Sequence, residues 1–363
     1  MNEREAYIAL NIMEKVGPVG VRSLVEKLGS AYAIFDADKI ALKSVKGIGP
    51  ETVEAIISQR ESVDWQGEID RAQNAGARII TRIDPEYPPR LLEIHDPPMA
   101  LYVKGSIESR DKQGIGIVGT RHPTHYGMET AEKMAYGLSK TGFTVISGLA
   151  LGIDTAAHKG ALKANGRTIA VIGSGLSRIY PESNKVLAEH ISANGAVISE
   201  FSMCREPDKT TFPIRNRIVS GLSRAVVVIE AGLKSGAIIT ANQALEQGRS
   251  VMAVPGRVDS PASKGCHDLI KNGARLVESV DDIIEEFEFL VPRSAEAREP
   301  RPRPSVSKEE ELLLKCLDSG ELDMDNLIRE SGLSASAVSS LLIGLEMKKL
   351  VQMRPGRVVE MLR

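Results

Sequence analysis

The feature that most constrains the fold is a series of short apolar segments between residues 114 and 256, each ending in small or turn-forming residues. The segments are GIGIVGTR, TVISGLA, TIAVIGSGL, GAVISE, AVVVIEA and SVMAVPG. Stretches with helical patterning, such as GMETAEKMAYGLSK and GIDTAAHKGALKANG, separate them. This alternation is typical of a doubly wound parallel sheet, and a continuous apolar run such as AVVVIEA indicates a strand buried on both faces. The sequence therefore predicts an α/β fold.

Length and composition allow more than one domain. The 363 residues are 42% hydrophobic, enough for two or three domains with at least one sizeable core. No apolar run reaches the ~18 residues of a membrane span, and the N-terminus lacks the basic-then-apolar order of a signal peptide. We therefore expect a cytoplasmic protein without membrane contact. Cys204, Cys266 and Cys316 are scattered, which indicates reduced thiols rather than a zinc site.

The pattern along the chain predicts four regions. They are a small helical domain (residues 1–80), an α/β domain (81–291), a Pro/Arg/Glu linker (292–304) and a winged-helix-like domain (305–363). The helical domain contains two glycine hairpins, Val16–Gly29 and Val45–Ile57, that resemble a helix-hairpin-helix unit. They either contact nucleic acid or merely join antiparallel helices. The proline-dense segment Ile83–Gly105 cannot be a long helix, so we expect an extended lead-in docked on the α/β domain.

Four loops at strand ends share one chemistry, because each offers backbone amides or hydroxyls where helix N-termini converge. Any one such loop is commonly structural, but four at one sheet edge favour an anionic ligand. The residues of these loops are Gly119, Thr120, Arg121, Ser147, Gly148, Gly173, Ser174, Gly175, Ser235, Gly236 and Thr240.

A basic patch accompanies these loops. From Lys209 to Arg224 the sequence contains cations and no Asp or Glu, in a chain whose formal net charge is −2. Arg215 and Arg217 lie two apart, so in an extended segment they would face one side while Asn216 points inward. Such a surface suits phosphate groups; the alternative is an ordinary solvated face.

Phe212 stands directly before Pro213 at the start of this patch, in a chain that is only 4% aromatic. A phenyl ring beside cations is suited to stacking on a nucleobase, an interaction worth ~1–3 kcal/mol per base. The alternative is core packing.

Catalytic chemistry has little support in the sequence. His122 and His125 have poor spacing for a metal, and Asp154 in GIDTAAH is explained by capping a helix. Ser147 and Ser174 lack a GxSxG elbow. We therefore predict a protein that is not an enzyme and uses no metal or cofactor.

In its motifs the chain resembles the DNA-processing protein A (DprA/Smf) family. The motifs are VGTR, SGLALGIDTAAHKGAL, GSGLSRIYPESN, GAVISE, FPIRNRIVSGLS, SGAIITANQALEQGR and AVPGRVDSPASKGCHDLIKNGA. The resemblance implies a Rossmann-like fold that binds single-stranded DNA, forms a homodimer, protects incoming DNA and loads the RecA recombinase during natural transformation. It also implies a DNA pocket at matching positions, namely Arg121, Lys185, Phe212, Arg215 and Arg217. In the helix predicted from KGCHDLIKNGARL, it assigns His267, Ile270 and Leu276 to self-association; the alternative is packing against the sheet.

The winged-helix-like domain departs from a duplex-binding pattern. Its acids, which include Glu309, Glu310 and Glu311, outnumber its cations, whereas phosphate neutralisation requires a basic surface. We therefore favour protein contact or packing over DNA binding for this domain.

Two further functions stay open. The turn SGAIITA is similar to one in the nucleotide phosphoribohydrolases of the lysine-decarboxylase-annotated Rossmann group, whose PGGxGTxxE glutamate acts on the ribosyl bond. Here no carboxylate follows the turn until Glu246, which weighs against hydrolysis. The other alternative is an assembly scaffold to which DNA binding is incidental.

Overall fold

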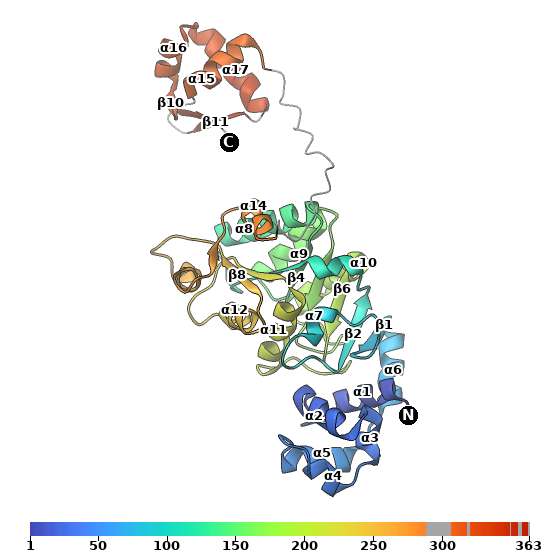
Figure 1. The fold of residues 1–363 in the computed structure, drawn as a ribbon. Coiled ribbons are helices and arrows are strands. Elements are labelled where there is room, and N and C mark those ends of the chain that lie inside the picture. Colours follow the sequence, from blue (N-terminus) through green and yellow to red (C-terminus); the bar gives the residue numbers. More distant parts are fainter. Residues whose placement is uncertain (288–305, 318–319, 349, 355–357, 362–363) are drawn as a thin grey trace. The chain divides into compact units, whose positions relative to one another are not determined.

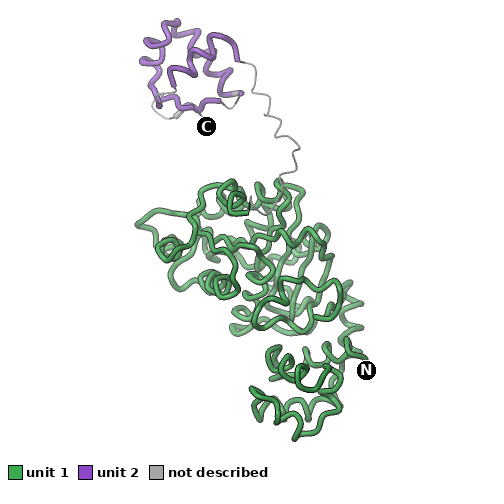
Figure 2. Tube along the Cα trace, in the orientation of Figure 1, with its two compact units in different colours: residues 1–287 green, residues 288–363 purple. Residues whose placement is uncertain are grey.

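The structure is a computed structural model, and it describes residues 1–287, 306–317, 320–348, 350–354 and 358–361. The chain divides into two compact units, residues 1–287 and 288–363 (Figure 2). The predicted linker, residues 292–304, lies outside the described residues. No helix in the described ranges is both long and apolar enough to cross a membrane.

The first unit is built on a nine-stranded sheet (Figure 1). Its strands are β1 (Ala77–Thr81), β2 (Ala100–Gly105), β3 (Gly114–Val118), β4 (Thr144–Ser147), β5 (Thr168–Val171), β6 (Ala196–Ser199), β7 (Ala225–Val228), β8 (Ser250–Ala253) and β9 (Arg275–Leu276). They lie in the order β1-β2-β6-β5-β4-β3-β7-β8-β9. The pairs from β6 to β9 are parallel, whereas β2 pairs antiparallel with β1 and β6. The predicted α/β fold with a Rossmann-like, doubly wound sheet is confirmed.

Helices cover both faces of this sheet (Figure 1). They are α7 (Pro89–Leu92), α8 (His125–Lys140), α9 (Ile153–Lys163), α10 (Lys185–Asn194), α11 (Thr211–Leu222), α12 (Gly236–Glu246), α13 (Lys264–Lys271) and α14 (Val280–Glu285). Short 3-10 turns lie at η1 (Ser109–Gln113), η2 (Glu182–Asn184) and η3 (Pro261–Ser263). Val226 packs in one core with α11, α12 and α13, and Val227 packs in another with α8, α9 and α14. Because successive strand residues point to opposite faces, both sides of β7 must be apolar, which explains the run AVVVIEA.

The N-terminal helices pack onto the antiparallel end of the sheet. They are α1 (Glu3–Ile12), α2 (Pro18–Leu28), α3 (Ala31–Asp36), α4 (Lys39–Lys43), α5 (Pro50–Gln59) and α6 (Trp65–Asn74). In both glycine hairpins the glycines lead into a helix, α2 in the first and α5 in the second, and each helix has a proline in its first turn. β1 straddles the predicted boundary at residue 80, and the Arg4 guanidinium donates to the carbonyl oxygen of Ile79 at 2.5 Å. The proline-dense lead-in forms the short α7 and strand β2 rather than a long helix.

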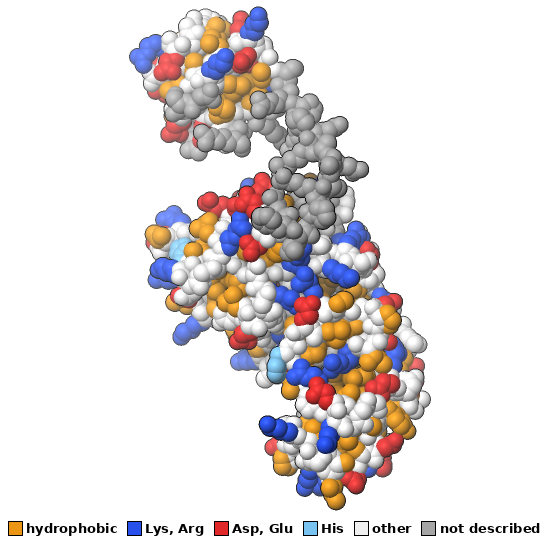
Figure 3. All heavy atoms as spheres, viewed as in Figure 1, with side chains coloured by type: hydrophobic (Ala, Val, Ile, Leu, Met, Phe, Trp, Pro, Cys, Tyr) orange, Lys and Arg blue, Asp and Glu red, His pale blue; other side chains and the backbone are white. Residues whose placement is uncertain are grey.

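Charges on the N-terminal helices are mixed rather than basic. Acidic and basic side chains alternate over them on the face in Figure 3. Lys39 pairs with Glu54 at 2.8 Å, and Lys15 pairs with Glu51 at 3.5 Å. Both are cations of the hairpin region, so part of its positive charge is neutralised within the domain.

The second unit has the helices and hairpin of a winged helix. Its elements are α15 (Lys308–Leu317), β10 (Leu322–Asp323), α16 (Met324–Ser331), α17 (Ala335–Met347), β11 (Val351–Arg354) and β12 (Val358–Met361). Leu313, Leu327 and Val338 join the three helices in one core, and the sheet order is β10-β12-β11. The exposed positions of α17 include Ser336, Ser339 and Ile343, none of them basic. The predicted winged-helix-like domain is confirmed.

Candidate nucleic-acid interface

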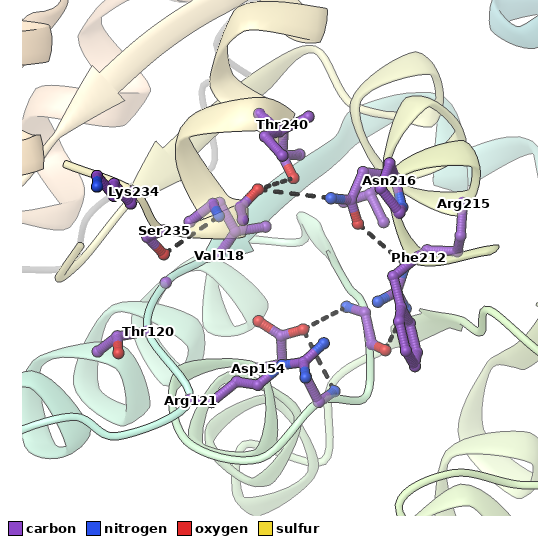
Figure 4. Close-up of a pocket in the computed structure, with 18 of the residues that line it drawn as sticks. Val118, Thr120, Arg121, Asp154, Phe212, Arg215, Asn216, Lys234, Ser235 and Thr240 are labelled. Carbon is purple, nitrogen blue, oxygen red and sulfur yellow. Dashed lines mark hydrogen bonds between the residues drawn. The ribbon is translucent and has the colours of Figure 1, made fainter. Parts of the chain in front are cut away.

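A cavity of about 600 Å3 opens where the winding of the sheet reverses (Figure 4). β3 and β7 are neighbours there, but α8 leaves β3 toward one face and α12 leaves β7 toward the other. The two loops diverge and leave a crevice at the carboxyl ends of the strands, which is where open α/β sheets bind ligands. We call it the electropositive cavity; its walls come from residues 118–122, 148–154, 209–219 and 232–240.

Among the described residues, the electropositive cavity is lined by four cations, Arg121, Lys209, Arg215 and Lys234, and by one carboxylate, Asp154. Arg121, Lys209 and Lys234 are exposed and make no ion pair with a carboxylate in the part of the chain that the structure describes. The formal net charge of the whole chain is only −2, so these unpaired cations are a local concentration of positive charge. Such a cavity attracts anions.

Backbone groups add to this positive field. α12 begins at Gly236 beside the cavity, and its N-cap Ser235 accepts a hydrogen bond from the Ala237 amide at 3.3 Å. The remaining amides of the first turn carry the partial positive charge of the helix dipole. Thr240 and Asn216 face the same turn from two helices (Figure 4). The arrangement is suited to holding a phosphate group.

Arg215 and Asp154 fix the floor of the cavity. The Arg215 guanidinium donates to the carbonyl oxygens of Gly148 and Val171, while Asp154 Oδ2 accepts from the amides of Gly148 at 3.1 Å and Ala150 at 3.3 Å. Burial lowers the pKa of Arg215 to about 10, with Asp154 opposing the shift. Burial also raises the pKa of Asp154, against the opposing effect of Arg215. Arg215 therefore remains charged at neutral pH, but its guanidinium donates hydrogen bonds to backbone carbonyl oxygens of the protein itself.

The prediction that Asp154 caps α9 is wrong, because Gly152 is the N-cap and Asp154 ties down the preceding loop. These hydrogen bonds from the loop amides to Asp154 require glycine at position 148. A Cβ atom there would lie 2.7 Å from both Arg215 Nη1 and Asp154 Oδ2, well inside contact distance. Gly148 thus permits the close approach that brings backbone, arginine and carboxylate together.

Phe212 lies at the edge of the electropositive cavity in a stack of side chains. The Arg121 guanidinium carbon is 5.0 Å from the centroid of its ring, and the Tyr180 ring centroid is 5.8 Å away. Both rings line a smaller side cavity of about 190 Å3. Gly173 forms part of its wall, and a Cβ there would come within 2.9 Å of the Phe212 ring. Phe212 is half-buried at the cavity wall, so neither core packing nor an open stacking platform describes it alone.

The expectation of an extended segment at FPIRNR is wrong, since these residues begin α11. Residues two apart on a helix point about 200° apart, so Arg217 faces away from Arg215. Arg217 is 6% exposed and pairs with Asp96 at 2.9 Å and with Glu200 at 2.5 Å. Arg224 lies beyond the end of α11, over the ring of Phe287. The basic patch of the sequence is therefore dispersed over separate environments.

Several of the other predicted DNA-binding residues do not line the electropositive cavity or the side cavity. Ser147 donates to the Ile117 carbonyl oxygen at 2.6 Å, and Ser174 donates to that of Arg178 at 2.6 Å, so both hydroxyls serve the fold. Gly175 packs against the backbone of Met203, and Lys185 is exposed at the start of α10. The cavities do contain the remaining positions, namely Gly119, Thr120, Arg121, Gly148, Gly173, Phe212, Arg215, Asn216, Ser235, Gly236 and Thr240.

Sequence reasoning missed Lys234 and Tyr180 in this site, and it identified Lys209 only as a cation of the basic patch. Lys209 and Lys234 stand immediately before the N-cap residues of α11 and α12, and a lysine at that place in a strand-end loop is a usable signal. Tyr180 is 48% exposed and lies beside Phe212. No signal in the sequence singled it out, since Tyr32, Tyr126 and Tyr136 are similarly exposed.

The predicted self-association residues divide between two elements at the sheet edge. His267 and Ile270 lie on α13, as expected, but Leu276 lies on β9, because the helix ends at Lys271. His267 Nε2 is 3.0 Å from the Gly256 carbonyl oxygen, and Ile270 packs partly on the sheet core. Leu276 is 44% exposed on the last strand.

Comparison with known proteins decides the family. Residues 78–288 match the family model of DNA recombination-mediator protein A, and residues 297–357 match the DprA winged helix domain. The chain belongs to the DNA recombination-mediator protein A family. It is 36% identical to the Smf protein of Synechocystis sp. over 98% of both chains. The resemblance to the DprA/Smf family is thereby confirmed.

Solved structures of family members agree with this fold. The structure of DprA from Streptococcus pneumoniae superposes with a TM-score of 0.69 at 34% identity, covering 80% of this chain and 99% of that one. DNA processing protein A from Helicobacter pylori, which is described as binding single-stranded DNA, gives a TM-score of 0.52 at 31% identity. That match covers 58% of this chain and 95% of that one.

Proposed function

We propose that this family member binds single-stranded DNA across the electropositive cavity. The observation that carries the proposal is a set of three cations, Arg121, Lys209 and Lys234, that form no ion pair among the described residues and surround a helix N-terminus at the reversal point of the sheet. The single-strand binding described for the H. pylori relative supports the same ligand.

In this proposal the phosphates and the bases of the bound strand occupy different parts of the site. Phosphates lie near Arg121, Lys209, Lys234 and the first turn of α12, where charge and amides converge. A base lies in the side cavity that Tyr180 and Phe212 line. Because Arg121 covers the Phe212 ring, a base that stacks on that face must displace the guanidinium, which is then free to meet a phosphate.

Binding of fluorescent oligonucleotides over a salt series tests the proposal. We expect single strands to bind more tightly than duplex, with affinity falling steeply as salt rises, since phosphate contacts release counterions. Equal affinity for both, or a flat salt dependence, would contradict it. Nuclease digestion of the strand in the presence and absence of protein tests protection directly.

We propose further that the protein is a cytoplasmic recombination mediator that passes incoming strands to the RecA recombinase during natural transformation. The family description and the resemblance of the motifs support this role. RecA filament assembly on strands coated with single-strand-binding protein should start sooner when the protein is added. An unchanged lag at saturating protein would overturn the loading role.

The proposed role is binding rather than catalysis. Asp154 is the carboxylate that lines the electropositive cavity, and two backbone amides hold it below the surface. Glu246 lies at the far end of α12 from the cavity. Incubation with nucleoside monophosphates should therefore release no free base, and release that depends on Asp154 would favour the phosphoribohydrolase alternative.

We propose that the protein forms a homodimer through α13 and the neighbouring edge strand β9. An edge strand has unpaired backbone groups, and Leu276 adds an exposed apolar side chain there. Leu276→Glu is a cleaner test than Ile270→Glu, because Ile270 also packs on the core. Sedimentation at micromolar concentration should show a dimer for the wild type and a monomer for the variant; the same species for both would exclude this surface.

A further inference from the structure

Helix α11 is the wall between two cavities. Phe212 and Arg215 line the electropositive cavity, whereas Ile214 and Arg217 line a second cavity of about 650 Å3. Pro213 lines both. The far wall of the second cavity is formed by the end of α1 and the loop into α2, so we call it the interdomain cavity.

Polar contacts of Arg217 span this cavity. Arg217 Nε donates to Asp96 Oδ2 at 2.9 Å, and Nη2 donates to Glu200 Oε2 at 2.5 Å. The main-chain oxygen of Glu200 in turn accepts from Asn11 Nδ2 of α1 at 2.9 Å. The side chains of Arg217 and Glu200 are 7% and 10% exposed. One cluster of polar contacts, buried at Arg217 and Glu200 but 36% exposed at Asp96, thereby connects α11, the segment before β2, the loop after β6 and the N-terminal helices.

Arg217 is poorly placed to bind a phosphate itself. Two of its nitrogens are occupied by carboxylates, and the third, Nη1, is buried without a hydrogen-bond partner in the described structure. A phosphate would have to displace Asp96 or Glu200 and would be repelled by the other. The contribution of Arg217 to strand binding must therefore act through the position of the helix that carries it.

We infer that Arg217 is a positioning residue that sets where α11 holds Phe212 and Arg215 and that links the N-terminal helices to the DNA site. The inference rests on the proposed single-strand binding. Because a cavity lies between α11 and α1, few side chains pack between the two helices at this point. The ion pairs of Arg217 therefore fix the distance between these helices, since buried ion pairs require a specific geometry. Coupling of this kind is reciprocal: if docking of the N-terminal helices favours strand binding, the strand must favour docking.

The first test neutralises Glu200 without changing its shape. Glu200→Gln should weaken binding of a single-stranded oligonucleotide by about 10-fold while the slope of affinity against salt stays unchanged, because no phosphate contact is lost. Glu14→Gln is the matched control: it makes the same change on the opposite wall, at a residue exposed to solvent, and should bind like the wild type. Thermal melting checks that each variant is folded, and Arg217→Lys, which keeps the charge but not the two-sided geometry, should also weaken binding.

The second test follows docking through Trp65, the sole tryptophan of the chain. Trp65 packs both with the core of the N-terminal helices and with the core against β1 and β2. Oligonucleotide should shift Trp65 emission in the wild type and in Glu14→Gln, and should leave it nearly unchanged in Glu200→Gln at saturating strand. Wild-type affinity and an intact emission shift in Glu200→Gln would overturn the inference. Absence of single-strand binding by the wild type would instead refute the proposed function.

Discussion

The two cavities on either side of α11 have similar volumes, about 600 and 650 Å3, but they differ in whether their cations form ion pairs. In the electropositive cavity, Arg121, Lys209 and Lys234 stand unpaired among the described residues. In the interdomain cavity, Arg217 is neutralised by two carboxylates and Arg205 pairs with Asp208 at 2.7 Å. Cavity volume therefore does not distinguish a phosphate site from an interdomain contact. What distinguishes the phosphate site is the presence of cations without ion-pair partners beside a helix N-terminus.

The contrast extends to single residues of one helix. Arg215 and Arg217 belong to the same short motif, yet one serves the floor of the electropositive cavity and the other the interdomain contact. The helical turn alone separates them. We therefore expect substitution of Arg217 to lower both stability and strand binding, whereas substitution of the exposed cations Arg121, Lys209 and Lys234 should lower strand binding with little effect on stability.

The largest effect is expected from Arg217→Ala. Removal of one partner leaves Asp96 and the buried Glu200 without their cation, which should lower the free energy of unfolding by about 3 kcal/mol. Urea denaturation measures this. The Glu200→Gln/Arg217→Ala double variant should recover part of the loss, because the unpaired charge is gone; a strictly additive loss would argue against the ion-pair account.

The next effect sharpens the role of the electropositive cavity. Replacing Arg121, Lys209 and Lys234 together with Gln should reduce single-strand affinity by roughly 100-fold and flatten the salt slope by about 2 units, since three phosphate contacts are lost. Lys133, Lys140 and Lys163, exposed on α8 and α9, provide a control that removes the same charge elsewhere. If both triple variants lose the same slope, general charge rather than this cavity governs binding.

Phe212→Leu separates stacking from charge. The substitution keeps apolar bulk beside Gly173 but removes the ring, and should weaken single-strand binding by about 1.5 kcal/mol with little change in salt slope. Oligonucleotide titration at two salt concentrations measures both quantities. Should the melting temperature collapse while the folded fraction binds normally, Phe212 is a core residue instead.

The smallest effect concerns His158, which lies fully buried on α9. Its Nδ1 is 2.7 Å from Thr168 Oγ1, whose proton goes to the Val145 carbonyl oxygen, so Nδ1 donates and Nε2 carries no proton. Burial, with a smaller contribution from the Arg215 charge, lowers the pKa of His158 to about 3.

The unfolded chain therefore binds a proton below its ordinary histidine pKa while the folded protein does not. Stability should fall by about 1 kcal/mol as pH drops from about 6.5 to about 5.5. His158→Gln should remove this dependence, whereas His190→Gln, at an exposed position on α10, should retain it. Unfolding free energies at the two pH values decide the matter; identical pH dependence in all three proteins would exclude His158 as the source.

Much of the fold was predictable from the sequence because it depends on local pattern. Apolar runs ending in small residues predicted the parallel strands between residues 114 and 256. The loop residues Gly119, Thr120, Arg121, Ser235 and Gly236 were found because strand ends of an α/β sheet meet at one edge.

The tertiary structure alone decided which charged side chains are exposed at the cavity and which are buried in ion pairs. FPIRNR has the composition of an exposed basic segment, and its helical conformation with Arg217 buried between Asp96 and Glu200 depends on residues far away in the chain. Tyr180 reaches Phe212, and Lys209 and Lys234 share one cavity, only because separate crossovers converge. Local sequence sets the period and ends of an element, whereas the charge and burial of each side chain depend on its neighbours in space, and those are set by the topology of the sheet.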